Sequence, residues 1–179
     1  MRKFLFAVLG LCIVAALAGY IASPYFAFHQ LQRAANAGDR DGLEATVDFP
    51  AVRDDFKAQL NTAFMAKMQS DPGMKDNPFA AVGMLLVPAV IGRVIDSYIT
   101  PQGIALMVAK ARTPQQGARP SDGDSGHIRS HSGYVSLDRF QAVVSNDAHP
   151  DQSLTFVMER RGLVTWKLIR IALPPAALK

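Results

Sequence analysis

The chain has 179 residues, enough for one domain with a hydrophobic core, and carries a net charge of +4. Arg2 and Lys3 supply half of this excess and the longest basic run elsewhere is Arg160-Arg161, so the charge does not favour a nucleic-acid partner. The single cysteine, Cys12, excludes a fold stabilised by disulfides within the chain.

The N-terminal stretch from Phe4 to Ala22 contains 19 residues and no charged or strongly polar side chain. At a rise of about 1.5 Å per residue, a helix of this length just crosses a hydrocarbon core of roughly 30 Å. Its bulky members are Phe4, Leu5, Phe6, Val8, Leu9, Leu11, Ile13, Val14, Leu17 and Ile21. We therefore predict a transmembrane anchor over residues 1–22.

The residues around this stretch bear on its orientation and processing. Arg2 and Lys3 favour an amino terminus in the cytoplasm, because basic residues return only at Arg33. We expect a single-pass protein of the inner (cytoplasmic) membrane with its domain in the periplasm. A cleaved signal peptide is the alternative, with Ala16-Leu17-Ala18 as an A-x-A-like site. The apolar run continues past this site, which favours a retained anchor.

Helical periodicity dominates the segment that follows the anchor. Apolar residues recur at helical spacing from Tyr25 to Ala35, and Gly38 suits the C-terminal cap of this helix. The anchor is therefore expected to lead almost directly into the first helix of the domain. Asp39 is a candidate N-cap for a short second helix.

A longer helix is predicted from residue 50 to about residue 70. Asp48 can accept hydrogen bonds from its first N–H groups, and Pro50 suits its first turn. Apolar residues then recur every four positions, at Val52, Phe56, Leu60, Phe64 and Met68. This row predicts one buried side.

Residues 79–95 form a second strongly apolar stretch, which Pro88 and two glycines interrupt. The part before Arg93 is too short to span a membrane comfortably, so the main expectation is a kinked helix buried in the core. A surface that faces lipid or a partner, and a second span, are the alternatives. Thr100 and Pro101 then predict the N-cap and first position of a further helix.

The composition and period change in the last third of the chain. Residues 112–132 are rich in Pro, Gly, Ser, Gln and Asp and are predicted to form a flexible loop. Alternating patterns then predict strands over residues 134–137, 140–145, 154–159 and 164–173. Helices followed by an antiparallel sheet of three to four strands indicate one α+β domain over residues 23–174, with a tail at 175–179.

Four segments follow one another in a characteristic order, Val47–Arg53, Thr100–Gly103, Tyr134–Phe140 and Glu159–Leu168. Their distinctive positions are Asp48, Phe49, Pro50, Arg53, Thr100, Pro101, Arg161, Gly162 and Trp166. This order resembles the bacterial DUF2939 family over about residues 23–174. The resemblance implies a membrane segment and an α+β domain but no activity, because the family has none assigned. The helix layout is also similar to cone-shaped domains of the nuclear transport factor 2 and cystatin type, which curve a sheet around a pocket.

The polar residues show no catalytic pattern and predict no cofactor and no metal. His127 and His131 are four residues apart, but they fall in the predicted loop beside Asp122 and Asp124, without the remaining acidic ligands of a calcium loop. Asp48 is interpreted as a helix cap rather than as an acid or base.

Three functions follow from these observations. The first is a non-enzymatic, membrane-anchored domain that binds a protein or another envelope component. The second is a cone that holds an apolar small molecule or lipid between the 79–95 helix and the sheet. The third is an enzyme on such a cone, which would need a buried carboxylate or histidine beside a cavity. Trp166 and Tyr134 are expected to pack the sheet against the helices rather than to line a ligand site.

Overall fold

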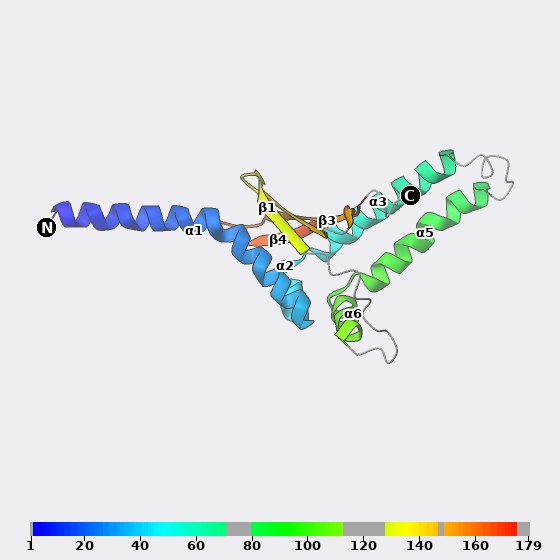
Figure 1. The fold of residues 1–179 in the computed structure, drawn as a ribbon, viewed down its shortest axis with the longest axis horizontal. Helices are drawn as coiled ribbons and strands as arrows, with labels where there is room; N and C mark the ends of the chain where they lie inside the picture. Colours follow the sequence, from blue (N-terminus) through cyan, green and yellow to red (C-terminus); the bar gives the residue numbers. More distant parts are fainter. Residues whose placement is uncertain (1, 71–79, 113–127, 147–148, 175–179) are drawn as a thin grey trace.

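The computed structural model describes residues 2–70, 80–112, 128–146 and 149–174. Its helices are α1 (Arg2–Ala37), α2 (Arg40–Thr46), α3 (Phe49–Ser70), α5 (Ala80–Tyr98) and α6 (Pro101–Arg112). Its strands are β1 (Ile128–Ser136), β2 (Arg139–Asn146), β3 (His149–Arg160) and β4 (Trp166–Ala172). The helices precede the sheet along the chain, which confirms the predicted α+β class (Figure 1).

Helix α1 joins the apolar N-terminal stretch to the domain without a break. It contains Pro24, and Figure 1 shows it changing direction between a projecting part and the part beside α2. Gly38 ends the helix with φ at +66°. The Gly38 N–H donates to the Ala35 carbonyl at 3.2 Å, and the Asp39 N–H donates to the Ala34 carbonyl at 2.9 Å, a Schellman motif. The predicted direct connection and the Gly38 cap are both confirmed.

Two of the three predicted N-caps use their side chains. Asp48 Oδ1 accepts a hydrogen bond from the Ala51 N–H at 3.2 Å at the start of α3. Thr100 Oγ1 accepts one from the Gly103 N–H at 2.9 Å at the start of α6. Asp39 precedes α2 as predicted, but its side chain makes no capping hydrogen bond. The starts of α3 and α6 are therefore fixed locally.

The four strands form an antiparallel meander in the order β1-β2-β3-β4. Phe140 pairs with Met158, which pairs with Leu168, and these side chains are at most 3% exposed, so they form one buried row. Two predicted boundaries were wrong, because β1 begins at Ile128 and β3 begins at His149. Pairing with β2 extends both strands into polar sequence that local propensity does not favour.

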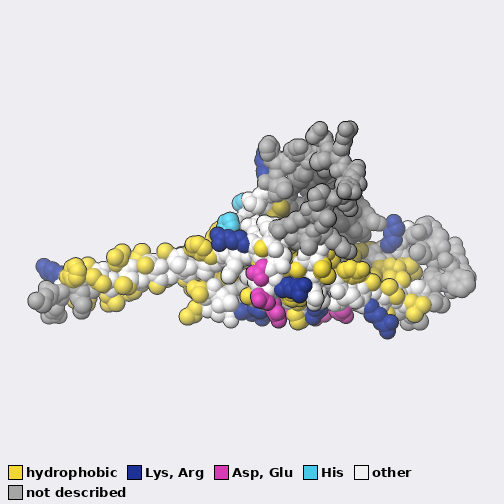
Figure 2. Space-filling model, turned by 90° about the horizontal axis from the view of Figure 1, so that it is seen from below, with side chains coloured by type: hydrophobic (Ala, Val, Ile, Leu, Met, Phe, Trp, Pro, Cys, Tyr) yellow, Lys and Arg dark blue, Asp and Glu magenta, His cyan; other side chains and the backbone are white. Residues whose placement is uncertain are grey.

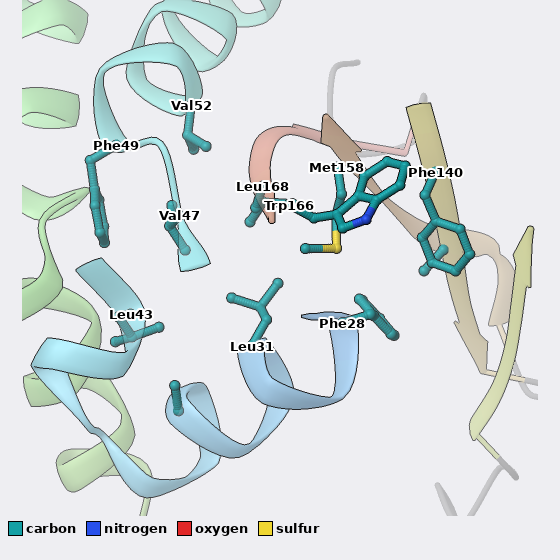
Figure 3. Packing of buried hydrophobic residues seen from close by; sticks show 12 residues of the cluster. Phe28, Leu31, Leu43, Val47, Phe49, Val52, Phe140, Met158, Trp166 and Leu168 are labelled. Atoms are coloured by element: carbon teal, nitrogen blue, oxygen red, sulfur yellow. The ribbon is translucent and has the colours of Figure 1, made fainter. Parts of the chain in front are cut away.

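The core lies between one face of the sheet and helices α1 to α3 (Figure 3). Its buried members are Phe28, Leu31, Ala34, Leu43, Val47, Phe49, Val52, Phe140, Ala142, Met158, Trp166 and Leu168. Trp166 packs edge-to-face against Phe140, with ring centroids 6.4 Å apart. Trp166 therefore packs the sheet against the helices, as predicted.

The helices also cover the edge of β4. The Asp48 N–H donates to the Leu168 carbonyl at 2.9 Å. Farther along the strand, Gln59 Nε2 donates to the Ile171 carbonyl and Gln59 Oε1 accepts from the Leu173 N–H, both at 3.0 Å. The Gln59 amide thus makes hydrogen bonds with the backbone of β4 and the residue after it that a neighbouring strand would otherwise make.

The position of α5 corrects the expectation for residues 79–95. Asp96 of α5 lies 2.7 Å from Lys57 Nζ of α3, and Figure 1 shows the two helices side by side, extending beyond the sheet. Ile95 is buried, at 5% exposure. Exposures of 50% to 59% are found at Leu86, Val90, Val94 and Tyr98. The interpretation as a buried core helix is wrong, because α3 covers only one side of α5.

Candidate membrane anchor and its junction with the domain

The N-terminal part of α1 projects from the domain and presents apolar side chains to its surroundings (Figures 1 and 2). Nine of the ten predicted anchor residues have described side chains, and all nine are exposed, from 43% at Val8 to 76% at Phe4. Leu5 lies in the same helix. Within the described ranges, one segment, Phe6–Ala37, is long and apolar enough to cross a membrane. By length and composition, this segment is consistent with a membrane anchor or a signal sequence.

Pro24 explains the polar contacts at the base of the projecting part. Proline has no N–H, and its ring disturbs the helix one turn earlier, so carbonyls there lose their usual partners. The Ser23 hydroxyl donates to the Tyr20 carbonyl at 2.7 Å. The Tyr134 hydroxyl donates to the Ile21 carbonyl at 2.9 Å. One hydroxyl from the sheet and one from the helix thus donate hydrogen bonds to two carbonyls at the bend.

Trp166 fixes the same point from the core side. Its Nε1 donates to Ser23 Oγ at 2.8 Å, and both residues are buried. Tyr134 packs edge-to-face on Trp166 within the sheet, with ring centroids 5.9 Å apart. The junction between anchor and domain is therefore a buried polar contact inside an aromatic cluster.

Arg160 connects the anchor with two turns of the sheet. Its guanidinium carbon lies 3.8 Å from the centroid of the Tyr20 ring and 4.3 Å from that of Trp166. Nε and Nη2 donate to the Leu137 carbonyl at 3.2 and 3.1 Å, and Nη1 donates to the Leu163 carbonyl at 2.5 Å. The planar guanidinium, which stacks and donates at once, holds the last turn of the anchor stretch beside both turns.

A hollow of about 870 Å³ lies beside this junction. Its wall includes Ala16, Gly19, Phe26, Ala45, Leu163 and Trp166. These residues come from α1, α2, the connection between β3 and β4, and the start of β4. The hollow therefore does not lie between the 79–95 helix and the sheet, where the sequence predicts a pocket. It lies beside the apolar part of α1.

The distinctive motif positions gather around the start of α3. Asp48 Oδ2 accepts a hydrogen bond from Arg161 Nη2 at 2.9 Å, which joins two segments 113 residues apart. Arg53 Nη1 donates to the Ile99 carbonyl at 3.2 Å, next to the Thr100 cap. Phe49 and Trp166 lie in the core, Pro50 in the first turn of α3, Pro101 at the start of α6 and Gly162 between β3 and β4. The structure thus gives most of these positions a role in joining elements.

The candidate chemical groups are dispersed. His131 is exposed in β1 rather than in a loop, whereas His127, Asp122 and Asp124 lie outside the described residues. The Ser136 hydroxyl donates to Asp138 Oδ1 at 2.6 Å and holds the pKa of Asp138 below its usual value. In the described part of the chain, no three His, Cys, Asp or Glu side chains could hold a metal ion.

A family model described as a protein of unknown function, DUF2939, matches residues 13–107. This range is more than half of the chain, so the chain belongs to the DUF2939 family. No curated protein and no solved structure matches it. The match begins inside the apolar part of α1 and ends in α6, so Arg161, Gly162 and Trp166 lie beyond it and their place in the family pattern stays a prediction.

Proposed function

We propose that this member of the DUF2939 family is a single-pass protein of the inner membrane that holds its α+β domain in the periplasm, where the domain binds an envelope component. The projecting part of α1 carries the proposal, since its described bulky side chains are all exposed and apolar. Such a surface is unfavourable in water. In lipid it is favourable, because a helix satisfies its own backbone groups there.

Charge supports the orientation. Arg2 and Lys3 precede the apolar stretch, and basic side chains close to a span are retained in the cytoplasm. The continuous helix supports a retained anchor over a cleaved signal. Cleavage after Ala18 would cut α1 directly before the turn in which Tyr20 stacks with Arg160.

Two observations favour binding over catalysis. The histidines and carboxylates whose side chains are described are all at least partly exposed, so none has the buried setting that shifts a catalytic pKa. The exposed row on α5, formed by Leu86, Val90, Val94 and Tyr98, is an apolar surface of the kind that partners cover.

Reporter fusions test the orientation. An enzyme active only outside the cytoplasm, fused after Lys179, should be active, and one active only in the cytoplasm should be inactive at the same position. Mass spectrometry of the membrane-extracted protein should find the chain intact from its N-terminal region. The reverse reporter pattern would refute the orientation, and a chain that begins at Gly19 would refute the retained anchor.

The hollow beside the junction favours a second function, the binding of a lipid or another apolar molecule. Its volume of about 870 Å³ falls in the range of small-molecule sites. Gly19 lies on its wall, and a Cβ added at Gly19 would meet no atom within 4 Å. A large side chain at this position should therefore fill the hollow without disturbing the helix.

Gly19→Phe and Gly10→Phe form a matched pair for this test. Gly10 also has nothing within 4 Å, but it lies on the projecting part and does not border the hollow. Native mass spectrometry of the detergent-purified protein should find a bound lipid with the wild type and with Gly10→Phe, and lose it with Gly19→Phe. Equal lipid retention by all three proteins, or none by the wild type, would remove the lipid-binding function.

A further inference from the structure

We infer that two turns at the anchor end of the sheet enter the lipid headgroup layer beside the anchor. These turns, here called the turn pair, are residues 136–139 between β1 and β2 and residues 161–165 between β3 and β4. The inference rests on the proposed function, because it requires α1 to span the membrane. It adds a second membrane contact, made by the domain itself.

The turn pair carries the two most exposed of the large apolar side chains that the structure describes. Leu163 is 82% exposed and Leu137 is 80% exposed. Val164 beside Leu163 and Val135 near Leu137 are 59% and 61% exposed. Turn tips in water favour Gly, Asn, Asp and Ser, so a leucine at both tips calls for an apolar contact outside the domain.

The contacts with α1 set the depth of the turn pair. Leu137 borders a hollow of about 190 Å³ together with Tyr20 and Ile21. Leu163 borders the larger hollow together with Ala16. Arg160 donates to the carbonyls of both tips and stacks on Tyr20, which lies two residues, about 3 Å along a helix, before the end of the apolar stretch. If α1 spans the bilayer, both tips lie level with the last turns of its apolar part.

The side chains around the turn pair suit the boundary between lipid and water. Tyr20 stacks on Arg160 and borders the smaller hollow together with Tyr134, and tyrosine is enriched at this level of membrane proteins. The arginine keeps its charge while it stacks on the Tyr20 ring.

Asp138 limits how far the turn pair can enter. Its carboxylate is exposed beside Leu137, and an exposed aspartate is ionised at neutral pH. A charge in the hydrocarbon centre is costly, so the turns reach the headgroup layer and no deeper. Continuity with the anchor also favours lipid as the occupant over a soluble protein, which would have to approach between the turns and the membrane surface.

Single-cysteine labels on the full chain can measure this depth. In a Cys12→Ala background, Leu137→Cys and Leu163→Cys place an environment-sensitive fluorophore on each tip. Leu106→Cys is the matched control, since Leu106 is a 53% exposed leucine of α6. The native chain, labelled at its only cysteine, reports the middle of the anchor. The proteins are reconstituted into vesicles of phosphatidylcholine and phosphatidylglycerol.

We expect lipids with a nitroxide near the headgroup to quench both tip labels strongly, while aqueous iodide quenches them several-fold less than it quenches the Leu106→Cys label. Lipids with a nitroxide deep in the acyl chain should quench Cys12 most. Tip labels that the headgroup nitroxide fails to quench would overturn the inference, whether iodide reaches them, as for tips in water, or does not, as for tips covered by protein. If Cys12 also escaped the deep quencher, the proposed span itself would fail.

Discussion

At the scale of single residues, the hydrogen bond between Trp166 and Ser23 joins the domain to its anchor. The Ser23 hydroxyl accepts from the indole N–H and donates to the carbonyl that Pro24 leaves free. Without the Ser23 hydroxyl, the buried indole N–H of Trp166 has no acceptor. Without the indole, that N–H is absent and needs none. The effects of substituting Ser23 and Trp166 on the free energy of unfolding should therefore be strongly coupled.

We predict that Ser23→Ala lowers the free energy of unfolding by about 1–3 kcal/mol in the wild type, because the indole N–H loses its partner. In a Trp166→Phe background, the same substitution should cost clearly less, since no N–H is stranded there. Circular dichroism during denaturant unfolding in detergent micelles measures all four proteins.

Ser97→Ala is the matched control for this cycle. The Ser97 hydroxyl donates to the Arg93 carbonyl at 2.8 Å on the exposed side of α5. Its removal should change the free energy of unfolding by no more than about 0.5 kcal/mol. An equal cost of Ser23→Ala with and without the indole would contradict the role given to this hydrogen bond.

At the scale of elements, the end of α1 decides how the helices fold back on one another. Gly38 has φ at +66° and lets the chain reverse into α2. Gly42 lies where α2 crosses α1, and a Cβ there would come within 2.9 Å of the Ala34 Cβ. Glycine is thus required by the backbone at one position and by close packing at the other.

Gly38→Ala should lower the free energy of unfolding by about 1–2 kcal/mol, the cost of a left-handed conformation for a residue with a Cβ. Steric overlap adds little, since its nearest contact would be the Ala105 carbonyl oxygen at 3.5 Å. Gly83→Ala is the matched control, because Gly83 lies within α5 with no atom within 4 Å. This control should be neutral or stabilise by up to about 1 kcal/mol. A stabilising Gly38→Ala would contradict the cap.

Elements whose signals are local could be predicted from the sequence. The Thr100 cap and the Gly38 cap depend on neighbours a few residues away, and the sheet order follows from sequential hairpins. The exposure of α5 could not be predicted, because an apolar helix has the same sequence whether it is covered or open. The start of β1 was missed because only pairing with β2 makes its polar residues a strand.

The candidate site also has one part with a local sequence signal and one part that depends on tertiary contacts. The long apolar N-terminal helix could be predicted, because hydrophobic length is a property of consecutive residues, and its role as a membrane anchor stays a proposal. Its junction with the domain could not, since Arg160 meets Tyr20 only after the 139 positions between them have folded. The Asp48–Arg161 ion pair was hidden for the same reason.

At the scale of the whole molecule, an apolar rod and a layered domain share one helix (Figure 1). The core uses Phe28 and Leu31 from the second part of this helix, so the domain could not lose α1 without losing part of its core. The helix proposed as the anchor is therefore also part of the fold. The projecting α3–α5 pair lies on the far side of the sheet from the rod (Figure 1).

The unbroken course of α1 has a mechanical consequence. A domain on a floppy linker samples a hemisphere above the membrane, and its reach grows with the length of the linker. A domain whose first helix continues from the span has almost no such reach. If α1 spans the membrane as proposed, the tilt of the domain follows the tilt of the helix in the bilayer, which changes with membrane thickness. The domain would then present itself to a partner in a narrow range of orientations.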